Sequence, residues 1–543
     1  MPSSFSLKAL KSKRKDKPAR ESHSSKFRNH ANTIHSKNVK IHYPTNDNGL
    51  KHLVDKAKKE GKRLRVIGGG YSSSHTVMHE YEDGKVLVAS LKKYKTKLIS
   101  DFTLDIRENI ITVNAGYTLG MVDRKMKECT RPGPNQRQST LYELKTYPSN
   151  PDYTIGGCVC APAYGGNISE GLFYDSVTRV RIMNSDGNFQ WMDSEDFLKF
   201  YKGSMGCFGI LTHVVLSIRE AKPTNCILSN LSVGLAPACV DVNKPDLATN
   251  FLKKFLKNIS QKSVHSIFVF DMYTNDLTGY GWVEASGNKH ISKLHSSPLD
   301  SNGNKMLSPY SECVLDQHNE GTPHLRVHKS HRSDKVHCNF RRCKAAMKGL
   351  VSIHCWEIEQ KVRQNVLTIN NYMWDVYHPH TLNMTYFIPV DKDFQSVYNA
   401  LKVISDATLK LTNESHYCPE LPTLFQFVQS SKGVFSPVKD GQMYMAVTMQ
   451  TLTFTIQPDE QDYLSTAWRN YYCEIEEGFL SLKGVPDYSG VYGFSEPDEI
   501  LNDESIKELL TSKEKRKVSM FLSQSDTNGV LQNMYIQQLT DQD

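Results

Sequence analysis

The sequence predicts an α+β protein built from more than one packed unit, and three observations support this. The chain has 543 residues, which exceeds the size at which a single hydrophobic core stops growing. Short β-rich runs alternate with glycines and helical stretches from residue 39 onward, and longer alternating runs follow near the carboxyl end. The hydrophobic fraction of 39% and the aromatic fraction of 10% are typical of globular proteins.

The amino-terminal residues form a basic segment that differs in composition from the rest. Residues 1–45 carry eleven Lys or Arg against two acidic residues, while the whole chain has a formal net charge of +8. A basic, apolar-poor composition predicts a disordered tail over residues 1–36. Its run Lys11–Lys15 could serve nuclear import or contact anionic partners. Nucleic acid is not the expected partner, because only Phe5 and Phe27 could stack on bases.

Hydropathy and cysteine content limit which cellular compartment is expected. No uncharged apolar stretch approaches the roughly 20 residues that span a bilayer, and the amino terminus lacks the apolar run of a secretion signal. Twelve cysteines in so long a chain do not make a disulfide scaffold. We therefore expect a cytoplasmic protein without a transmembrane segment, with nuclear import through the basic tail as the alternative.

The first expected unit covers residues 37–220, where strands lead into glycines and helices. Apolar residues at helical spacing predict helices, and short apolar runs bounded by glycines predict strands. The expected elements are helices over Asn48–Gly61 and Leu119–Cys129, and strands over Leu64–Ile67, Lys85–Leu91, Ile110–Val113 and Gly209–Ile218.

The second expected unit covers residues 221–500 and is built on a sheet. Strands are predicted over Met384–Val390, Phe425–Val428 and Met443–Thr455, with a helix between Phe394 and Leu411. Residues 284–345 are polar and lack periodicity, which predicts an inserted surface segment.

The polar insert contains the residue types of a zinc site. A closed tetrahedral site needs four convergent ligands, and the spacing of these side chains does not indicate one. A solvated loop is therefore the favoured interpretation, and no metal is predicted. The residues are His324, His328, His331, His337, Cys338 and Cys343.

A glycine- and serine-rich turn follows the strand that ends at Ile67. Glycine permits close backbone approach, so successive amides can point at a diphosphate, and the serine hydroxyls add donors. The turn matches neither the nucleotide P-loop nor the GxGxxG fingerprint. Its candidate cofactor-binding residues are Gly68, Gly69, Gly70, Tyr71, Ser72 and Ser73.

Two further glycine-rich blocks follow the first in order along the chain. The second runs over residues 154–167 and the third over residues 202–212. An isolated glycine turn is weak evidence for a binding site, whereas three ordered blocks are specific. The candidate residues that these blocks add are Thr154, Gly156, Gly157, Tyr164, Gly165, Gly166 and Ile210.

Together these blocks resemble the vanillyl-alcohol oxidase superfamily, which has the PCMH-type FAD-binding fold, and within it the branch of aldonolactone, gulonolactone and alditol oxidases. The resemblance implies a two-part FAD-binding domain over residues 37–220 and a cap domain, built on a large antiparallel sheet, over residues 221–500. It implies that residues 501–543 return to the FAD-binding domain. Further segments that carry the resemblance are residues 384–402, Phe427-Val428, Ser436-Pro437 and residues 528–533.

The chain departs from this family where relatives attach the flavin. Many relatives carry a histidine bonded covalently to the flavin where this chain has Tyr71, and the histidine expected in the second block is Tyr164. The resemblance therefore implies FAD that is held without a covalent bond. His75 stays open as an alternative attachment point.

The chain also departs from the family on the substrate side. Relatives commonly carry a Glu-x-Arg where this chain has Leu424 and Gln426, and a His-Trp-Gly-Lys where it has residues 487–490, Asp-Tyr-Ser-Gly. The candidate catalytic residues are Gln426, Asp487 and Tyr488. Asp487 could act as a base, or it could only cap a turn, because turns favour aspartate.

The resulting expectation is an FAD-dependent oxidoreductase that oxidises a hydroxylated small molecule, such as a sugar lactone, a polyol or another alcohol. Hydride would pass to flavin N5, and electrons would leave to oxygen or another acceptor. The alternative is a protein that keeps FAD as a redox sensor or binding protein and has lost turnover with the usual catalytic residues.

Overall fold

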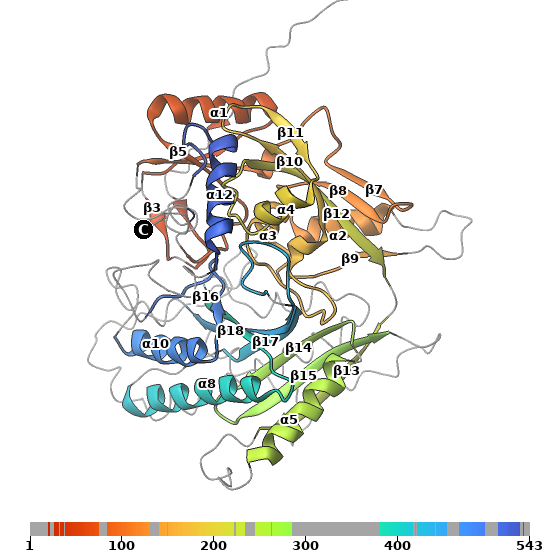
Figure 1. Cartoon of the computed structure of the whole chain (residues 1–543), viewed down its shortest axis with the longest axis vertical. Helices are drawn as coiled ribbons and strands as arrows, with labels where there is room; N and C mark the ends of the chain where they lie inside the picture. Colours follow the sequence, from red (N-terminus) through yellow and green to blue (C-terminus); the bar gives the residue numbers. More distant parts are fainter. Residues whose placement is uncertain are drawn as a thin grey trace, which may run out of the picture.

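The computed structural model shows two lobes, each built from sheets and helices (Figure 1). Residues of both lobes line a cavity between them. This arrangement confirms the predicted α+β class. The residues that the structure describes are 20–21, 27–31, 33–36, 38–74, 84–129, 141–148, 150–221, 224–233, 245–261, 263–284, 381–415, 419, 421–439, 441–452, 466–494, 509–532 and 536.

The upper lobe in Figure 1 begins with a small sheet in which three neighbouring strands run parallel. Helix α1 (Asp47–Glu60) connects two of them. Asn46 caps it by accepting a hydrogen bond from the Gly49 amide, and Gly61 ends it in the left-handed conformation at φ +60°. In spatial order the strands are β1 (Arg20–Glu21), β4 (Ile41–Tyr43), β6 (Val86–Ser90) and β5 (Arg63–Ile67).

A second sheet of the upper lobe is antiparallel throughout, and β9 (Tyr142–Leu144) extends it by pairing with the far end of β12. Its strands in spatial order are β11 (Phe189–Met192), β10 (Val177–Met183), β12 (Ile210–Glu220), β8 (Ile110–Asn114) and β7 (Phe102–Asp105). The helices of this lobe are α2 (Leu119–Cys129), α3 (Ile155–Cys160), α4 (Glu195–Tyr201) and the short 3₁₀ helices η2 (Leu91–Lys93) and η3 (Phe173–Ser176).

The lower lobe is built on an antiparallel sheet that has seven strands in the part of the chain that the structure describes. Its strands in spatial order are β13 (Thr224–Ser232), β15 (Asp276–Glu284), β14 (His265–Asp271), β17 (Thr423–Gln429), β18 (Met443–Leu452), β16 (Thr381–Pro389) and β19 (Val485–Pro486). Its helices are α5 (Pro245–Ser260), α8 (Gln395–Glu414) and α10 (Thr466–Ser481).

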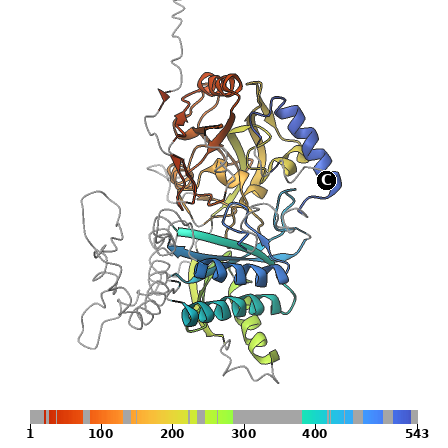
Figure 2. The same ribbon diagram turned by 90° about the vertical axis from the view of Figure 1, so that its left-hand side faces the viewer.

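The alternation of residues along β14 shows how this sheet joins the two lobes. Ile267 and Val269 belong to the core of the upper lobe, while Phe268 and Phe270 belong to the core shared with the helices of the lower lobe. Successive side chains on a strand point to opposite faces, so the sheet is buried on both sides. Figure 2 shows the sheet between the upper lobe and helices α8 and α10. Helices α8 and α10 cover one face of the sheet, and the face toward the upper lobe forms the floor of the cavity.

The carboxyl-terminal segment lies against the upper lobe, where α12 (Ser512–Ser525, blue in Figure 1) packs on α4. The ring centroid of Phe521 lies 5.7 Å from that of Phe197 and 5.2 Å from that of Phe200. The amide of Leu64 donates to the carbonyl of Val530 at 2.7 Å, and Arg65 Nη1 donates to the carbonyl of Leu531 at 2.8 Å. The last described residues therefore stabilise the strand that leads into the first glycine turn.

The structure differs from the expected disordered tail over residues 27–31 and 33–36. Strands β2 (Phe27–Arg28) and β3 (His35–Ser36) form a hairpin there, and Phe27 and Ile34 are only 2% and 4% exposed. Composition averaged over a basic segment concealed these few apolar residues, whose burial is sufficient to order the hairpin. Strand β1 also lies within residues 1–36 and pairs with β4.

Most expected elements agree with the structure to within a few residues. The helices over Asn48–Gly61 and Leu119–Cys129 are confirmed as α1 and α2, and the strands of both lobes are confirmed with shifts at their ends. The polar insert over 284–345, including its histidines and cysteines, lies outside the described residues apart from Glu284. No helix within the described ranges is long and apolar enough to cross a membrane.

Candidate functional site

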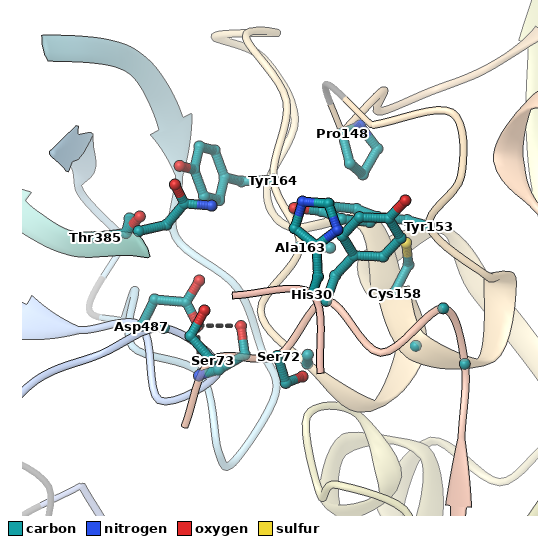
Figure 3. A pocket seen from close by; sticks show the side chains of 18 of the residues that line it. His30, Ser72, Ser73, Pro148, Tyr153, Cys158, Ala163, Tyr164, Thr385 and Asp487 are labelled. Atoms are coloured by element: carbon teal, nitrogen blue, oxygen red, sulfur yellow. Dashed lines mark hydrogen bonds between the residues drawn. The ribbon is translucent and has the colours of Figure 1, made fainter. Parts of the chain in front are cut away.

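A deep cavity lies between the two lobes, with a volume of about 1710 Å³ when the space open to solvent is included. The turn after β5 and the start of α3 line it from the upper lobe, while β16, β17, β18 and the turn after β19 line it from the lower lobe. Figure 3 shows Tyr164, Thr385 and Asp487 on one side of the cavity, and His30, Tyr153 and Cys158 on the other.

The turn over residues 68–73 brings backbone amides to the cavity wall. Gly70 has φ +77°, which favours glycine, and a Cβ on Gly68 would lie 2.1 Å from Thr154 Oγ1. Among the described residues, none accepts a hydrogen bond from the amides of Gly69, Gly70 or Ser72. Successive unengaged amides of this kind can bind an anion.

The second block contributes the amino-terminal turn of α3. Thr154 caps this helix, and its Oγ1 accepts a hydrogen bond from the Gly157 amide at 3.2 Å. Both residues line the cavity, whereas Gly156 does not, and its amide donates to the carbonyl of Ala115 at 2.9 Å. Only part of the predicted second block therefore faces the cavity.

Three other predicted cofactor-binding residues have packing roles behind the cavity wall. A Cβ on Gly165 would lie 2.5 Å from the carbonyl oxygen of Tyr147, and Ile210 is buried in β12. Gly166 accepts a hydrogen bond from the Ser266 amide at 2.7 Å, which joins the upper lobe to β14. A Cβ at position 166 would lie 1.9 Å from the Ser266 carbonyl oxygen, so glycine is what permits this contact.

Tyr71 is held between two rings at the cavity wall. Its ring centroid lies 4.6 Å from that of His30 and 5.1 Å from that of Tyr153. Its hydroxyl donates to Asp152 Oδ2 at 3.4 Å. Burial, followed by the charge of Asp152, raises the pKa of Tyr71, so its phenol is neutral at physiological pH.

A chain of three hydroxyls crosses from the upper lobe to the sheet. Tyr164 Oη lies 2.5 Å from Thr448 Oγ1, which lies 2.9 Å from Thr385 Oγ1. Burial raises the pKa of Tyr164 to about 12. The three groups therefore act as neutral donors and acceptors facing the cavity.

Asp487 places a buried carboxyl group at the edge of the same sheet. It is 9% exposed, and its Oδ1 accepts from the Ser489 amide at 2.8 Å and from Ser489 Oγ at 2.7 Å. Burial raises the pKa of Asp487 to about 6, which the two bonds from Ser489 only partly offset. The residue therefore caps a turn and also carries a carboxyl group that titrates near neutral pH.

Tyr488 lines the cavity, but its hydroxyl is directed into the protein. The side chain is 1% exposed, and its hydroxyl donates to the Gly203 carbonyl at 2.9 Å. Burial raises its pKa well above the ordinary value. Its carbonyl oxygen accepts from Ser74 Oγ at 2.5 Å, so the residue connects the two walls of the cavity.

Two buried glutamine side chains on the sheet leave polar atoms without partners. Gln426 and Gln450 are 4% and 8% exposed, and both line the cavity. Gln426 Nε2 and Gln450 Oε1 have no hydrogen-bond partner among the described residues. Leaving a buried polar atom without a hydrogen-bond partner lowers the stability of the folded protein by about 1–3 kcal/mol. These two atoms therefore indicate a ligand that would supply the missing hydrogen bonds.

The donor and acceptor set fits a bound FAD together with a second small molecule. Unengaged amides at the turn suit a diphosphate, and the polar strip on the sheet suits a hydroxylated molecule. Of the predicted site residues, those that the structure brings to the cavity are Gly68, Gly69, Gly70, Tyr71, Ser72, Ser73, Thr154, Gly157, Tyr164, Gln426, Asp487 and Tyr488.

Sequence reasoning missed several lining residues. Asn383 and Thr385 are polar at alternate positions of an otherwise apolar strand, as are Thr448 and Gln450 on its neighbour. Such alternation marks a polar face on a buried sheet and could have identified them. His30 also lines the cavity, but it lies in the segment expected to be disordered. The alternative attachment residue His75 lies outside the described residues.

Comparison with known proteins finds an FAD-binding family and two lactone oxidases. The family described as FAD binding domain matches residues 40–193. The D-arabinono-1,4-lactone oxidase of Debaryomyces hansenii is 26% identical over 198 residues, which is 34% of this chain and 33% of that protein. The L-gulonolactone oxidase of Mus musculus is 22% identical over 193 residues, which is 35% of this chain and 39% of that protein. The matches thus span less than half of these relatives.

Solved structures resemble the chain over almost its whole length. A cholesterol oxidase from B. sterolicum has a TM-score of 0.65 at 11% identity, and the match covers 96% of this chain and 97% of that one. A solvent-stable cholesterol oxidase has a TM-score of 0.61 at 11% identity, with 96% and 98% covered. At such low identity this likeness shows the fold alone.

Proposed function

We propose that the chain is an FAD-dependent oxidoreductase of the PCMH-type FAD oxidase superfamily, and that it oxidises an alcohol group of a hydroxylated small molecule; the family match and the two lactone oxidase relatives support this proposal. The observation that carries this proposal is the placement of Asp487 in the cavity that the glycine turn lines. A site for the cofactor and a buried carboxyl group of raised pKa thus share one enclosure.

The upper lobe supplies the contacts that would hold FAD. The amides of Gly69, Gly70 and Ser72 would donate to the diphosphate, and Thr154 and Gly157 line the adjacent wall. A hydrogen bond to a charged group contributes about 1.5–3 kcal/mol, so several such amides suffice for tight binding. When bound, FAD supplies a two-electron acceptor for hydride from a carbon atom, and oxygen or another acceptor then removes the electrons.

Asp487 would remove the proton of the hydroxyl group that is oxidised. Because its pKa is raised to about 6, the carboxylate predominates at neutral pH and is a stronger base than an ordinary aspartate. Ser489 fixes Oδ1 through two hydrogen bonds, which orients the carboxyl group. Gln426 Nε2 and Gln450 Oε1 would bind further hydroxyl groups of the substrate and gain the partners they lack.

FAD is held without a covalent bond in this proposal. The residue at the position where relatives carry the attached histidine is Tyr71, whose neutral phenol packs between His30 and Tyr153. Acid precipitation of the protein should therefore release the flavin into the supernatant. Flavin fluorescence that remains on the denatured polypeptide would contradict this and would direct attention to His30 or His75.

A substrate panel tests the proposed activity. Purified protein loaded with FAD is supplied with sugar lactones, polyols and other alcohols, and hydrogen peroxide or reduction of an artificial acceptor is measured. Steady turnover of at least one class is expected. Bound flavin that chemical reductant reduces but that no panel member reduces would contradict oxidation and favour the sensing or binding alternative.

A further inference from the structure

The hairpin β2–β3 precedes the part of the chain that matches the FAD binding domain family, because that match begins at residue 40. Phe27 and Ile34 are buried in a small core together with Val86 and Val88 of β6. The hairpin is therefore fixed on the sheet whose strand β5 leads into the glycine turn.

Asn29 closes this hairpin and also reaches the turn. It is 3% exposed, and its Oδ1 accepts from the Ile34 amide at 3.0 Å. Its Nδ2 donates to Thr33 Oγ1 at 2.7 Å and to the carbonyl of Ser72 at 2.9 Å. The geometry of the hairpin is thus coupled directly to the position of the turn.

Two more hydrogen bonds connect the hairpin to the turn. The amide of His30 donates to the Gly70 carbonyl at 2.7 Å, and Thr33 Oγ1 donates to the Ser73 carbonyl at 2.6 Å. With the contact from Asn29, three carbonyl groups of the turn are held by one short segment.

These bonds fix the peptide units that carry the Gly70, Ser72 and Ser73 carbonyls, and thereby the direction of the Tyr71, Ser73 and Ser74 amides. The amides of Gly69, Gly70 and Ser72 belong to the neighbouring peptide units of the same turn. In a planar trans peptide the C=O and N–H groups point in opposite directions, so a carbonyl held toward the hairpin directs the following amide away from it. The Ser72 carbonyl faces Asn29, and the amide of the same peptide unit, that of Ser73, donates to Ser489 across the cavity at 2.8 Å. The turn is therefore held from both sides before any ligand binds.

The hairpin also contributes a side chain to the cavity wall. His30 lines the cavity, and its ring packs against that of Tyr71 at 4.6 Å. Figure 3 shows His30 beside Tyr153 and Ala163. An imidazole offers N–H donors and a flat face, both of which suit a dinucleotide.

We propose that residues 27–31 and 33–36 form an additional FAD-binding segment, in which Asn29 and Thr33 position the glycine turn and His30 contacts the bound dinucleotide. The proposal rests on FAD binding and not on oxidation. A turn that is already held in position loses less conformational entropy when FAD binds. Removing the hairpin contacts should therefore weaken FAD binding.

The test measures FAD affinity in the full-length protein freed of flavin, by the change in flavin fluorescence on titration. Thr33→Val removes one hydroxyl that donates to a carbonyl, and His30→Gln removes the imidazole. The dissociation constant should rise about tenfold in each variant. Thr178→Val is the matched control, because Thr178 Oγ1 donates to the Val215 carbonyl in a sheet away from the cavity. His52→Gln, at an exposed position of α1, is the second control.

Unfolding temperatures measured without FAD separate positioning from a general loss of fold. The proposal expects His30→Gln to unfold at the wild-type temperature while binding FAD more weakly, and expects both controls to bind FAD as the wild type does. Unchanged FAD affinity in both hairpin variants would overturn it, even if their stability fell. A wild-type chain that binds no FAD would overturn this proposal and the proposed function together, whereas FAD binding without turnover would overturn only the latter.

Discussion

Replacing Asp487 by asparagine separates the two roles that its geometry allows. Burial raises the pKa of Asp487 from its ordinary value of 3.8 to about 6. A shift of about two pKa units corresponds to about 3 kcal/mol of folding free energy, since one unit is about 1.36 kcal/mol. Asparagine keeps the Oδ1 atom that accepts both bonds from Ser489, so the turn should survive the change.

The sign of the effect follows from proton binding. The folded protein binds the proton of Asp487 more tightly than the unfolded chain does, so stability decreases as the pH rises from about 4 to 6. The full penalty is present above pH 6. Asp487→Asn should therefore stabilise the protein by up to about 3 kcal/mol at pH 8 and change its stability little at pH 4.

The assay combines denaturant unfolding of the flavin-free protein at pH 4 and pH 8 with steady-state kinetics of the loaded protein. If Asp487 is the base, kcat should fall by a factor of about 10²–10⁴, and wild-type kcat/KM should rise with pH through about 6. Asp105→Asn is the control, because Asp105 accepts the Arg107 amide at 3.0 Å in a similar but exposed turn. Undiminished turnover by Asp487→Asn would refute the base and leave only the cap.

Three further substitutions test the walls of the cavity. Gly69→Val should weaken FAD retention, measured as flavin per protein after gel filtration, because a Cβ at this position would lie 2.6 Å from the Tyr71 ring. Full retention would contradict the need for glycine beside that ring. Gly166→Ala should lower the free energy of unfolding by about 1–3 kcal/mol, because the new Cβ would lie 1.9 Å from the Ser266 carbonyl oxygen. An unchanged free energy of unfolding would refute the tight contact between the upper lobe and β14. Gln426→Leu should stabilise the substrate-free protein by about 1–3 kcal/mol, because it removes a buried donor that lacks a partner. It should also raise KM, because that donor would no longer bind the substrate. An unchanged KM would contradict an amide that faces the substrate.

The local elements of the fold were largely predictable from the sequence. The helix α1 follows from Leu50, Leu53, Val54 and Ala57 on one face, and Gly61 ends it where a left-handed residue is required. The strands of the lower lobe follow from apolar alternation. Their ends were less predictable, because the limits of β16 and β18 depend on pairing between strands.

Site residues were predictable from a local signature at the first glycine turn, and from the family resemblance at Gln426, Asp487 and Tyr488, all of which line the cavity. The glycine turn over residues 68–73 has a local signature, so its place at the cavity could be predicted. Gly165 and Gly166 have the same signature, but their glycines serve contacts with Tyr147 and Ser266 that lie far away in the sequence. The contribution of His30 depends on the burial of neighbouring apolar residues, which the basic composition concealed.

The absorption spectrum of the purified protein, recorded while substrate is added without oxygen, reports both FAD binding and oxidation. We expect a bound oxidised flavin, present at about one per chain after FAD is supplied, whose visible absorption bleaches when an alcohol from the reactive class is added. A protein that takes up no FAD, and therefore stays colourless, would contradict both FAD binding and FAD-dependent oxidation.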